Sequence, residues 1–194
     1  MNQSEQELIG ALQRGEQQAF SQAVTLYQHM VYNTVLSILQ NEADAEDTTQ
    51  EVFIQIFQSV KSFKGTAKLS TWLYQIAIAK AIDLERKKKR KKRFGFMQQL
   101  FVDDDTTLHE PVEFNHPGVL LENKERAAKL FKALQNIPHN QRIAFMLNKI
   151  EGLDNEEISV IMKTSFYAVE SLLARAKKNL KKELKNYYSQ NSAK

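Results

Sequence analysis

Apolar positions recur at helical spacing over most of the chain. In the N-terminal part, one stripe steps by three or four residues over Phe20–Ile38, and a second covers Val52–Val60. A third begins at Leu69, after a break at 64–66, and continues into a run of basic residues. Sustained period-two alternation, the mark of strands, does not occur. The pattern predicts an all-α fold with a helical N-terminal domain over residues 1–93.

Residues 94–123 lose the helical period. They hold an acidic run at 103–105 and two of the three prolines, Pro111 and Pro117, which are typical of a linker. The segment is longer than ordinary connections, and its apolar start at 94–102 is expected to pack on something. We therefore predict two small helical domains on a long linker, free to take more than one relative arrangement.

The C-terminal domain, residues 124–194, ends in a helix-turn-helix pattern. Asp154 and Glu157 form a capping box that opens a short helix, and Ser165 can cap the long basic helix that follows. The turn between such helices often prefers glycine for its left-handed backbone, so Lys163 is the weak point. This arrangement predicts binding to duplex DNA, and an antiparallel helix pair with a solvated basic face is the alternative.

In a helix-turn-helix protein, the N-terminal end of the second helix enters the major groove. The residues predicted to meet base edges there are Ser165, Phe166, Tyr167, Ala168, Glu170 and Ser171. Arg175 and Lys178 lie further along and are predicted to lie near phosphates.

Charge is segregated along the chain, which matters more than the net value of +4. Residues 42–51 hold five acids and no base, residues 86–93 are all Lys or Arg, and residues 175–185 hold six bases against one acid. Blocks of this kind suit a nucleic acid for the basic segments and a different partner for the acidic one.

Two further patterns sharpen this interpretation. Phe63, Trp72 and Tyr74 precede the basic run at 86–93, and aromatic rings beside a cationic track are what single-stranded bases stack upon. Core packing of Trp72 and a solvated basic face are the alternatives. The acids Asp44, Asp47 and Glu51 share one helical face, beside Phe53 and Ile54, which would suit a basic and partly apolar protein surface.

Catalytic signatures are missing from the sequence. The absence of cysteine excludes disulfides, thiolate zinc sites and a cysteine nucleophile, and it fits a reducing cytoplasm. There is no phosphate-binding glycine-rich loop, no His-Glu-x-x-His, and the four histidines are scattered. The polar N-terminus has no signal core, and no apolar run approaches membrane-spanning length. We expect a cytoplasmic protein that is not an enzyme, with no membrane insertion, metal or cofactor.

The motifs resemble a known family. Residues 44–53, 63–65, 69–74 and 81–83 closely resemble region 2 of extracytoplasmic-function sigma factors, and residues 157–177 resemble their region 4. Only the linker is unmatched. The resemblance implies a sigma factor that binds core RNA polymerase and directs promoter-specific initiation. A stand-alone helix-turn-helix regulator leaves the acidic helix and the Trp72 segment unused, and a helical interaction protein leaves both basic blocks unused.

The resemblance also implies roles for individual residues. Contact with the clamp coiled coil of the largest polymerase subunit falls to Asp44, Asp47, Gln50, Glu51, Phe53 and Ile54. The loop before Leu69 would hold an unpaired base of the minus-ten element. The residues that the resemblance assigns to minus-ten binding are Phe63, Lys64, Gly65, Lys68, Ser70, Thr71, Trp72, Tyr74, Gln75, Lys80, Arg86, Lys87 and Arg90. The last helix would read the minus-thirty-five element as duplex.

The chain departs from the family pattern at several positions. Ile78-Ala79 stands where the family often has Arg-Asn, so base contacts there are absent or replaced by Lys80. Ala168, Glu170 and Leu172 replace frequent Thr, Lys and Arg, which leaves the minus-thirty-five sequence open. Many members of the family are sequestered by an anti-sigma protein, and we expect such a partner here.

Overall fold

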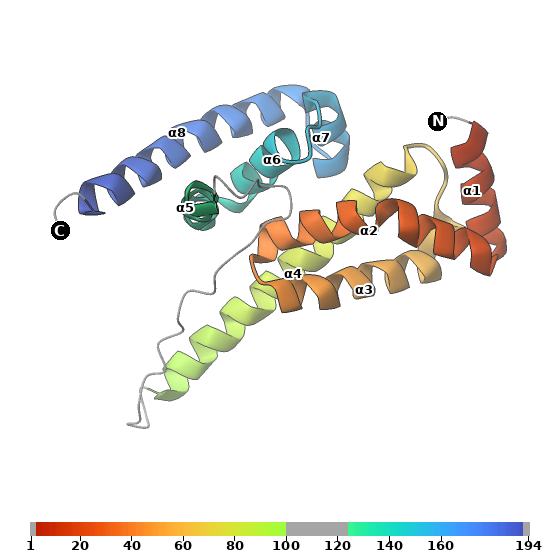
Figure 1. Cartoon of the computed structure of the whole chain (residues 1–194), viewed down its shortest axis with the longest axis horizontal. Helices are drawn as coiled ribbons and strands as arrows, with labels where there is room; N and C mark the ends of the chain where they lie inside the picture. The colour runs from red at the N-terminus through yellow and green to blue at the C-terminus, as the bar shows by residue number, and fades with distance from the viewer. Residues whose placement is uncertain (1–2, 100–123, 192–194) are drawn as a thin grey trace.

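The computed structural model describes residues 3–99 and 124–191, and all regular structure in these two ranges is helical (Figure 1). The elements are α1 (Gln3–Arg14), α2 (Gln17–Leu39), α3 (Glu42–Ser59), the 3-10 turn η1 (Val60–Ser62), α4 (Leu69–Gln99), α5 (Lys124–Gln135), α6 (His139–Lys149), α7 (Asn155–Met162) and α8 (Phe166–Asn191). The predicted all-α class is confirmed for these residues. Residues 100–123, most of the predicted linker, lie outside the described residues.

The predicted stripes pack α2, α3 and α4 against one another. Val31, Val52 and Leu73, one from each helix, are almost fully buried. The turn between α2 and α3 passes through Gln40, whose backbone is left-handed at φ 52°. Asn41 then caps α3, since its side-chain oxygen accepts from the Asp44 N–H at 2.9 Å. These three helices and α1 form what we call the N-terminal half.

Helix α1 is not predicted by the hydrophobic pattern. Its buried residues are Leu8, Ile9 and Leu12, which cover little more than one turn of an otherwise polar segment. These side chains join the main core, and α1 packs against α2 and η1. Tertiary contact therefore stabilises a helix whose own sequence signal is short.

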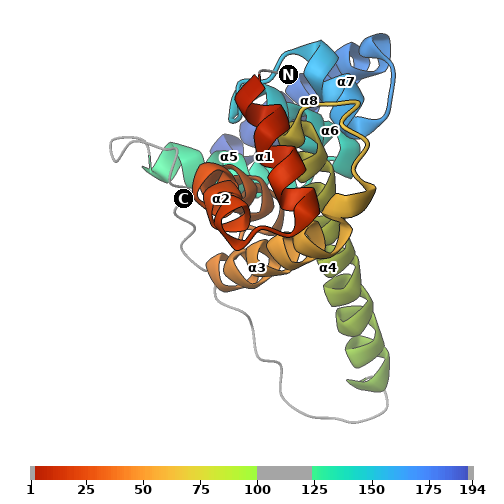
Figure 2. The same ribbon diagram turned by 90° about the vertical axis from the view of Figure 1, so that its right-hand side faces the viewer.

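Helix α4 continues to Gln99, into the segment predicted as linker. Lys and Arg are good helix formers, so the basic run at 86–93 extends the helix rather than ending it. The far end of α4 projects beyond the other helices of the N-terminal half (Figure 2).

Helices α5–α8 form the C-terminal half. The predicted capping box is present, with the Glu157 N–H donating to Asp154 at 2.8 Å, and the Ala168 N–H donates to Ser165 Oγ at 3.2 Å at the start of α8. Lys163 adopts the left-handed backbone, with φ 52°, at the turn where glycine is usual. The short helix, tight turn and long helix thus have the predicted geometry.

The two halves are in direct contact. Helices α6 and α7 lie against α2 and α4 (Figure 1), and one core cluster contains buried residues from both halves. Ile38 and Ile78 of the N-terminal half line a small cavity together with Ile143, Met146 and Leu147 of α6. The sequence predicts two domains on a linker, and in this arrangement they share an apolar interface.

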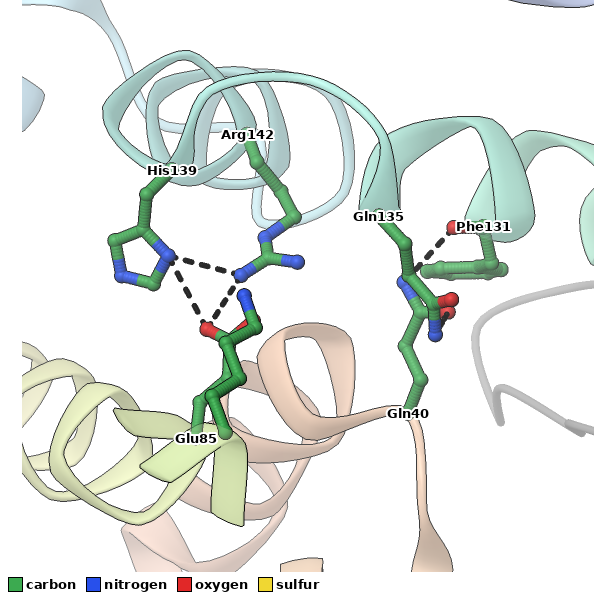
Figure 3. A network of polar contacts seen from close by, with 7 residues as sticks. Gln40, Glu85, Phe131, Gln135, His139 and Arg142 are labelled. Atoms are coloured by element: carbon green, nitrogen blue, oxygen red, sulfur yellow. Dashed lines mark hydrogen bonds and ion pairs between the residues drawn. The ribbon is translucent and has the colours of Figure 1, made fainter. Parts of the chain in front are cut away.

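Polar side chains tie the same interface (Figure 3). Glu85 on α4 accepts from Arg142 on α6 at 2.7 Å and lies 3.2 Å from His139 Nδ1. Gln40 donates to the backbone oxygen of Phe131 at 2.9 Å and accepts from Gln135 at 2.9 Å. This arrangement, with the two halves in contact, is called the closed arrangement, and it has specific hydrogen bonds as well as apolar packing.

Candidate nucleic-acid and protein interfaces

The acidic face of α3 is exposed at Asp47, Gln50 and Glu51, as the sequence predicts. Its carboxylates are not all free, because Glu51 pairs with Lys80 at 3.2 Å and Asp44 pairs with Lys88, both on α4. Such exposed pairs contribute little to stability and are exchanged readily for other partners.

The apolar part of this surface differs from the prediction. Phe53 lies in the core with 7% of its surface exposed, because it belongs to the same buried stripe as Val52 and Ile56. Ile54 and Phe57 are the exposed apolar residues of α3, each 57% exposed. The face therefore consists of Asp47, Gln50, Glu51, Ile54 and Phe57, which we call the α3 face.

The predicted single-strand site begins with the loop from Phe63 to Lys68. Phe63 is largely buried and stacks on Trp72, with ring centroids 4.9 Å apart and planes 28° apart. Each ring thus covers one face of the other ring. Thr71 is also buried. Within the loop, Lys64 and Lys68 are exposed and Gly65 is half-buried, as is Ser70 in the first turn of α4.

The C-terminal half covers part of this site. Tyr74, predicted to stack on a base, is 6% exposed, and its hydroxyl donates to Glu151 at 3.0 Å. Lys68 pairs with Glu157 of α7 at 3.0 Å. Gln75 donates to the backbone oxygen of Val160, also at 3.0 Å. Three of the predicted minus-ten residues therefore contact the C-terminal half in this arrangement.

The carboxylate and phenol at this contact influence each other's ionisation. Burial, together with the nearby Glu151 carboxylate, raises the pKa of Tyr74 well above its usual range. Burial also raises the pKa of Glu151, against the opposing effect of the hydrogen bond from Tyr74. Tyr74 stays a neutral donor throughout the physiological range, so the contact depends on the state of Glu151.

The basic part of α4 is open to solvent. Arg86, Lys87 and Arg90 are exposed and line a shallow hollow with Asp83 and Lys89. This track continues the helix that starts at the Phe63–Lys68 loop, so a strand leaving the loop would meet cations next (Figure 2).

The residues of the helix-turn-helix that are predicted to meet DNA differ in their exposure. Tyr167 is 79% and Phe166 40% exposed, and their rings meet edge to face at 5.9 Å. Glu170, Arg175 and Lys178 are also exposed. Ser165 caps the helix, and Ala168 and Ser171 are half-buried beside the packing residue Val169, which is fully buried.

Neither a metal-binding cluster nor a membrane-spanning helix is present among the described residues. In the described ranges, no cluster of three or more His, Cys, Asp or Glu side chains is placed to hold a metal ion. Over the same residues, none of the helices combines the length and apolar character needed to cross a membrane.

Sequence reasoning missed two groups of residues that organise the site. Glu5 and Gln13 of α1 hydrogen-bond the ends of the Phe63–Lys68 loop, and Glu85 with Arg142 ties the two halves. The one available signal for α1 was the short apolar group at Leu8, Ile9 and Leu12. No local pattern indicates the pairing of Glu85 with Arg142, which are distant in sequence.

Comparison with known proteins places this geometry in context. The family model described as Sigma-70 region 2 matches residues 23–91, and that described as Sigma-70, region 4 matches residues 127–180. The chain is similar to the RNA polymerase sigma-H factor of Pseudomonas aeruginosa, with 29% identity over 191 residues and 94% of each chain covered. Similarity to the ECF RNA polymerase sigma-E factor of Escherichia coli is 29% over 174 residues, covering 90% of this chain and 91% of the other.

A solved structure shares the fold. The sigma factor RpoE, crystallised in complex with the anti-sigma factor NepR from Bartonella quintana, superposes with a TM-score of 0.62 at 22% identity, covering 86% of this chain and 96% of that one. The fold is therefore one already seen in a solved structure.

Proposed function

The chain belongs to the sigma-70 family, as a sigma factor of the extracytoplasmic-function type, and on this basis we propose that it binds core RNA polymerase and directs promoter-specific initiation. The observation that carries the proposal is the presence, in order on one chain, of region 2 over residues 23–91 and region 4 over residues 127–180. We place the domain boundaries at 1–93 and 124–194, with residues 94–123 as the linker.

The α3 face is the proposed contact with polymerase. It combines carboxylates with two apolar side chains, Ile54 and Phe57, that are more than half exposed. A basic and partly apolar surface, such as a clamp coiled coil, complements it in both respects. In the free chain, Glu51 and Asp44 form ion pairs with Lys80 and Lys88 of α4. Basic residues of a partner would displace these two lysines.

The loop Phe63–Lys68 and α4 are the proposed minus-ten site. The stacked Phe63 and Trp72 rings form a rigid base for the loop, and the cations at Lys64, Arg86 and Arg90 would follow the strand backbone. Because Tyr74 is buried against Glu151 of the C-terminal half, DNA reaches its ring only after the two halves separate, and the exposed contacts of Lys68 and Gln75 with α7 would have to be exchanged for contacts with DNA.

The start of α8 is the proposed reader of the minus-thirty-five element. Phe166 and Tyr167 project from the N-terminal end of the helix, and Glu170 and Ser171 follow one turn later. Arg175 and Lys178 are exposed further along the helix, where they would contact phosphates. The left-handed turn at Lys163 sets the angle between α7 and α8 that such docking uses.

We further propose that the chain has no catalytic activity of its own, works in the cytoplasm beside the polymerase, and is controlled by an anti-sigma protein. RpoE is solved with such an inhibitor. Exposed apolar side chains at Phe57, Phe166 and Tyr167 would give a similar partner surfaces to cover.

The test is reconstitution of initiation. Purified chain is added to core polymerase and a library of genomic DNA fragments, and transcripts are mapped. The proposal expects transcripts that start at a shared sequence pattern and need both proteins. A stand-alone regulator would instead bind duplex without polymerase and support no new transcripts, and that outcome would overturn the proposal.

A further inference from the structure

Helix α1 holds both ends of the loop that the proposed function assigns to the minus-ten element. At the start of the loop, Gln13 Nε2 donates to the backbone oxygen of Phe63 at 2.8 Å. At its end, Glu5 Oε1 accepts from the backbone N–H of Leu69 at 2.8 Å. Two side chains from one short helix thus bracket the loop.

Glu5 fills a role that the loop cannot fill for itself. Lys68 stands immediately before α4, and its backbone oxygen accepts the first helical bond, from the Trp72 N–H at 3.3 Å. Its side chain carries only donors, so it cannot cap the first N–H groups of the helix, which have no acceptor within the helix. The carboxylate of Glu5 supplies the missing acceptor, and its charge suits the positive end of the helix.

Helix α1 is itself firmly attached. Leu8, Ile9 and Leu12 are each at most 7% exposed and belong to the main core. Phe63, whose backbone receives Gln13, is fixed on its other side by stacking on Trp72. Between the two anchored ends, Lys64, Thr66 and Lys68 are exposed, and Gly65 has the left-handed φ of 67°. The loop is therefore held at its two ends, with the exposed Lys68–Glu157 ion pair as a further contact to α7.

We propose that Glu5 and Gln13 are positioning residues for recognition of the unpaired minus-ten base. By fixing the Phe63 carbonyl and the Leu69 amide, they hold the loop in the one shape that discriminates between bases. The inference rests on the proposed function of the loop, and it assigns a role in specificity to a helix that lies before the matched region 2, residues 23–91.

The reasoning follows from how a flexible loop selects a base. A site selects by groups held within a fraction of an ångström, and a loop with a free end samples shapes that accept several bases. Losing one anchoring hydrogen bond should reduce the preference for the best base over the others by about tenfold. Contact of the α3 face with polymerase lies elsewhere on the N-terminal half and should not change.

The experiment uses the full chain bound to core polymerase and single-stranded DNA. The wild-type holoenzyme first selects from oligonucleotides randomised over the minus-ten region, and affinities are then measured for the best sequence and its single-base variants. Glu5→Ala and Gln13→Glu each remove one anchor. Glu5→Gln keeps an acceptor at the same place, and Glu7→Ala changes an exposed acid of the same helix as the matched control.

We expect Glu5→Ala and Gln13→Glu to reduce base discrimination about tenfold while core polymerase affinity is unchanged, with Glu5→Gln and Glu7→Ala close to wild type. Lower melting temperature with unchanged base discrimination would show that α1 is only a structural support, and would overturn the inference. If Glu5→Ala fails to fold, the inference is tested with Gln13→Glu, from the ratio of its affinities for the best sequence and for the single-base variants. Failure of the wild type to prefer any base would instead overturn the proposed function of the loop.

Discussion

Removing the carboxylate of Glu85 should release the C-terminal half from the N-terminal half. Arg142, the partner across the interface, has a side chain only 3% exposed and donates to Glu85 at 2.7 Å. Its Nε is buried without a hydrogen-bond partner in the described part of the chain, as is Nε2 of His139. In Glu85→Ala, the guanidinium would keep its burial and lose its counter-charge.

The magnitude follows from that burial. Leaving one member of a buried pair without its partner costs about 3–5 kcal/mol. Glu85 retains 17% exposure of its side chain, which places the estimate at the lower end, about 3 kcal/mol. Separation of the halves would return Arg142 to water and relieve this cost. The equilibrium between closed and open arrangements should therefore shift toward open by about a hundredfold.

The ion pair between Glu85 and Arg142 should persist over a wide range of pH. Burial alone would raise the pKa of Glu85, but hydrogen bonds from His139, Arg142 and Lys89 outweigh it and hold that pKa well below its usual range. A carboxyl group with a depressed pKa stabilises the closed arrangement above its ordinary pKa, and this contribution is lost only as the pH falls through the depressed value. The prediction can thus be measured at neutral pH without a competing protonation.

The assay is a distance distribution between spin labels. The chain contains no cysteine, so single cysteines placed at the exposed positions Gln58 and Lys181, one in each half, carry the labels without background. We expect a narrow distribution for the parent chain and a broad one, extending to longer distances, for Glu85→Ala. Lys89→Ala is the matched control, since Lys89 also pairs with Glu85 but is exposed and lies on the same helix.

Two results would refute the reasoning. A broad distribution already present in the parent would mean that the closed arrangement is not the dominant state. A narrow, unchanged distribution in Glu85→Ala, with helix content intact, would mean that the apolar packing around Ile78 and Ile143 holds the halves together without the ion pair.

Other predictions concern the separate surfaces. Asp47→Lys should weaken binding of core polymerase by about 2 kcal/mol, measured by titration of labelled chain, with helix content unchanged. Arg175→Ala should reduce the salt slope of promoter binding by about one, whereas Tyr167→Ala should change which promoters are selected, as read from a sequence library. Glu151→Gln should keep the hydrogen bond from Tyr74. Because the pKa of Glu151 is raised by burial, its contribution to closure is present below about pH 4 and is lost as the pH rises through that raised value. The Glu151→Gln variant should therefore favour the closed arrangement at neutral pH, and its equilibrium between closed and open arrangements should depend less on pH. Both effects can be measured with the same spin labels.

Much of the fold could be predicted because its signals are local. The stripe over Phe20–Ile38 becomes α2, and the capping box at Asp154 opens α7 where the sequence places it. Helix α1 was not predicted because its apolar residues, Leu8, Ile9 and Leu12, cover little more than one helical turn. Its stability comes from core partners elsewhere in the chain, which periodicity does not report.

The candidate site was predictable in composition but not in exposure. Amphipathic aromatic residues suit a base-stacking surface and a buried contact equally well. The pattern around Phe63 and Tyr74 therefore fitted single-stranded DNA, whereas the structure stacks Phe63 on Trp72 and turns Tyr74 toward Glu151. For Tyr74 the outcome depends on what packs against α4, and its partner Glu151 lies 77 positions later in the chain.

The departure from the family at Ile78-Ala79 gains a physical reason from this contact. Where the family often carries Arg-Asn, this chain places Ile78 at the cavity shared with Ile143 and Leu147 of α6. An arginine there would bring a second charged group into a cavity that Glu151 already lines, in place of apolar contacts with α6. An isoleucine instead adds apolar area to the closed arrangement. Under the proposed minus-ten assignment, Ile78 favours closure where an arginine would favour a base contact, and together with the Glu85–Arg142 pair it stabilises the state in which Tyr74 is buried against Glu151. If α4 holds the minus-ten site as proposed, promoter access and closure compete for one surface of this helix, so a partner that binds the separated halves would favour transcription, and one that binds across both would oppose it.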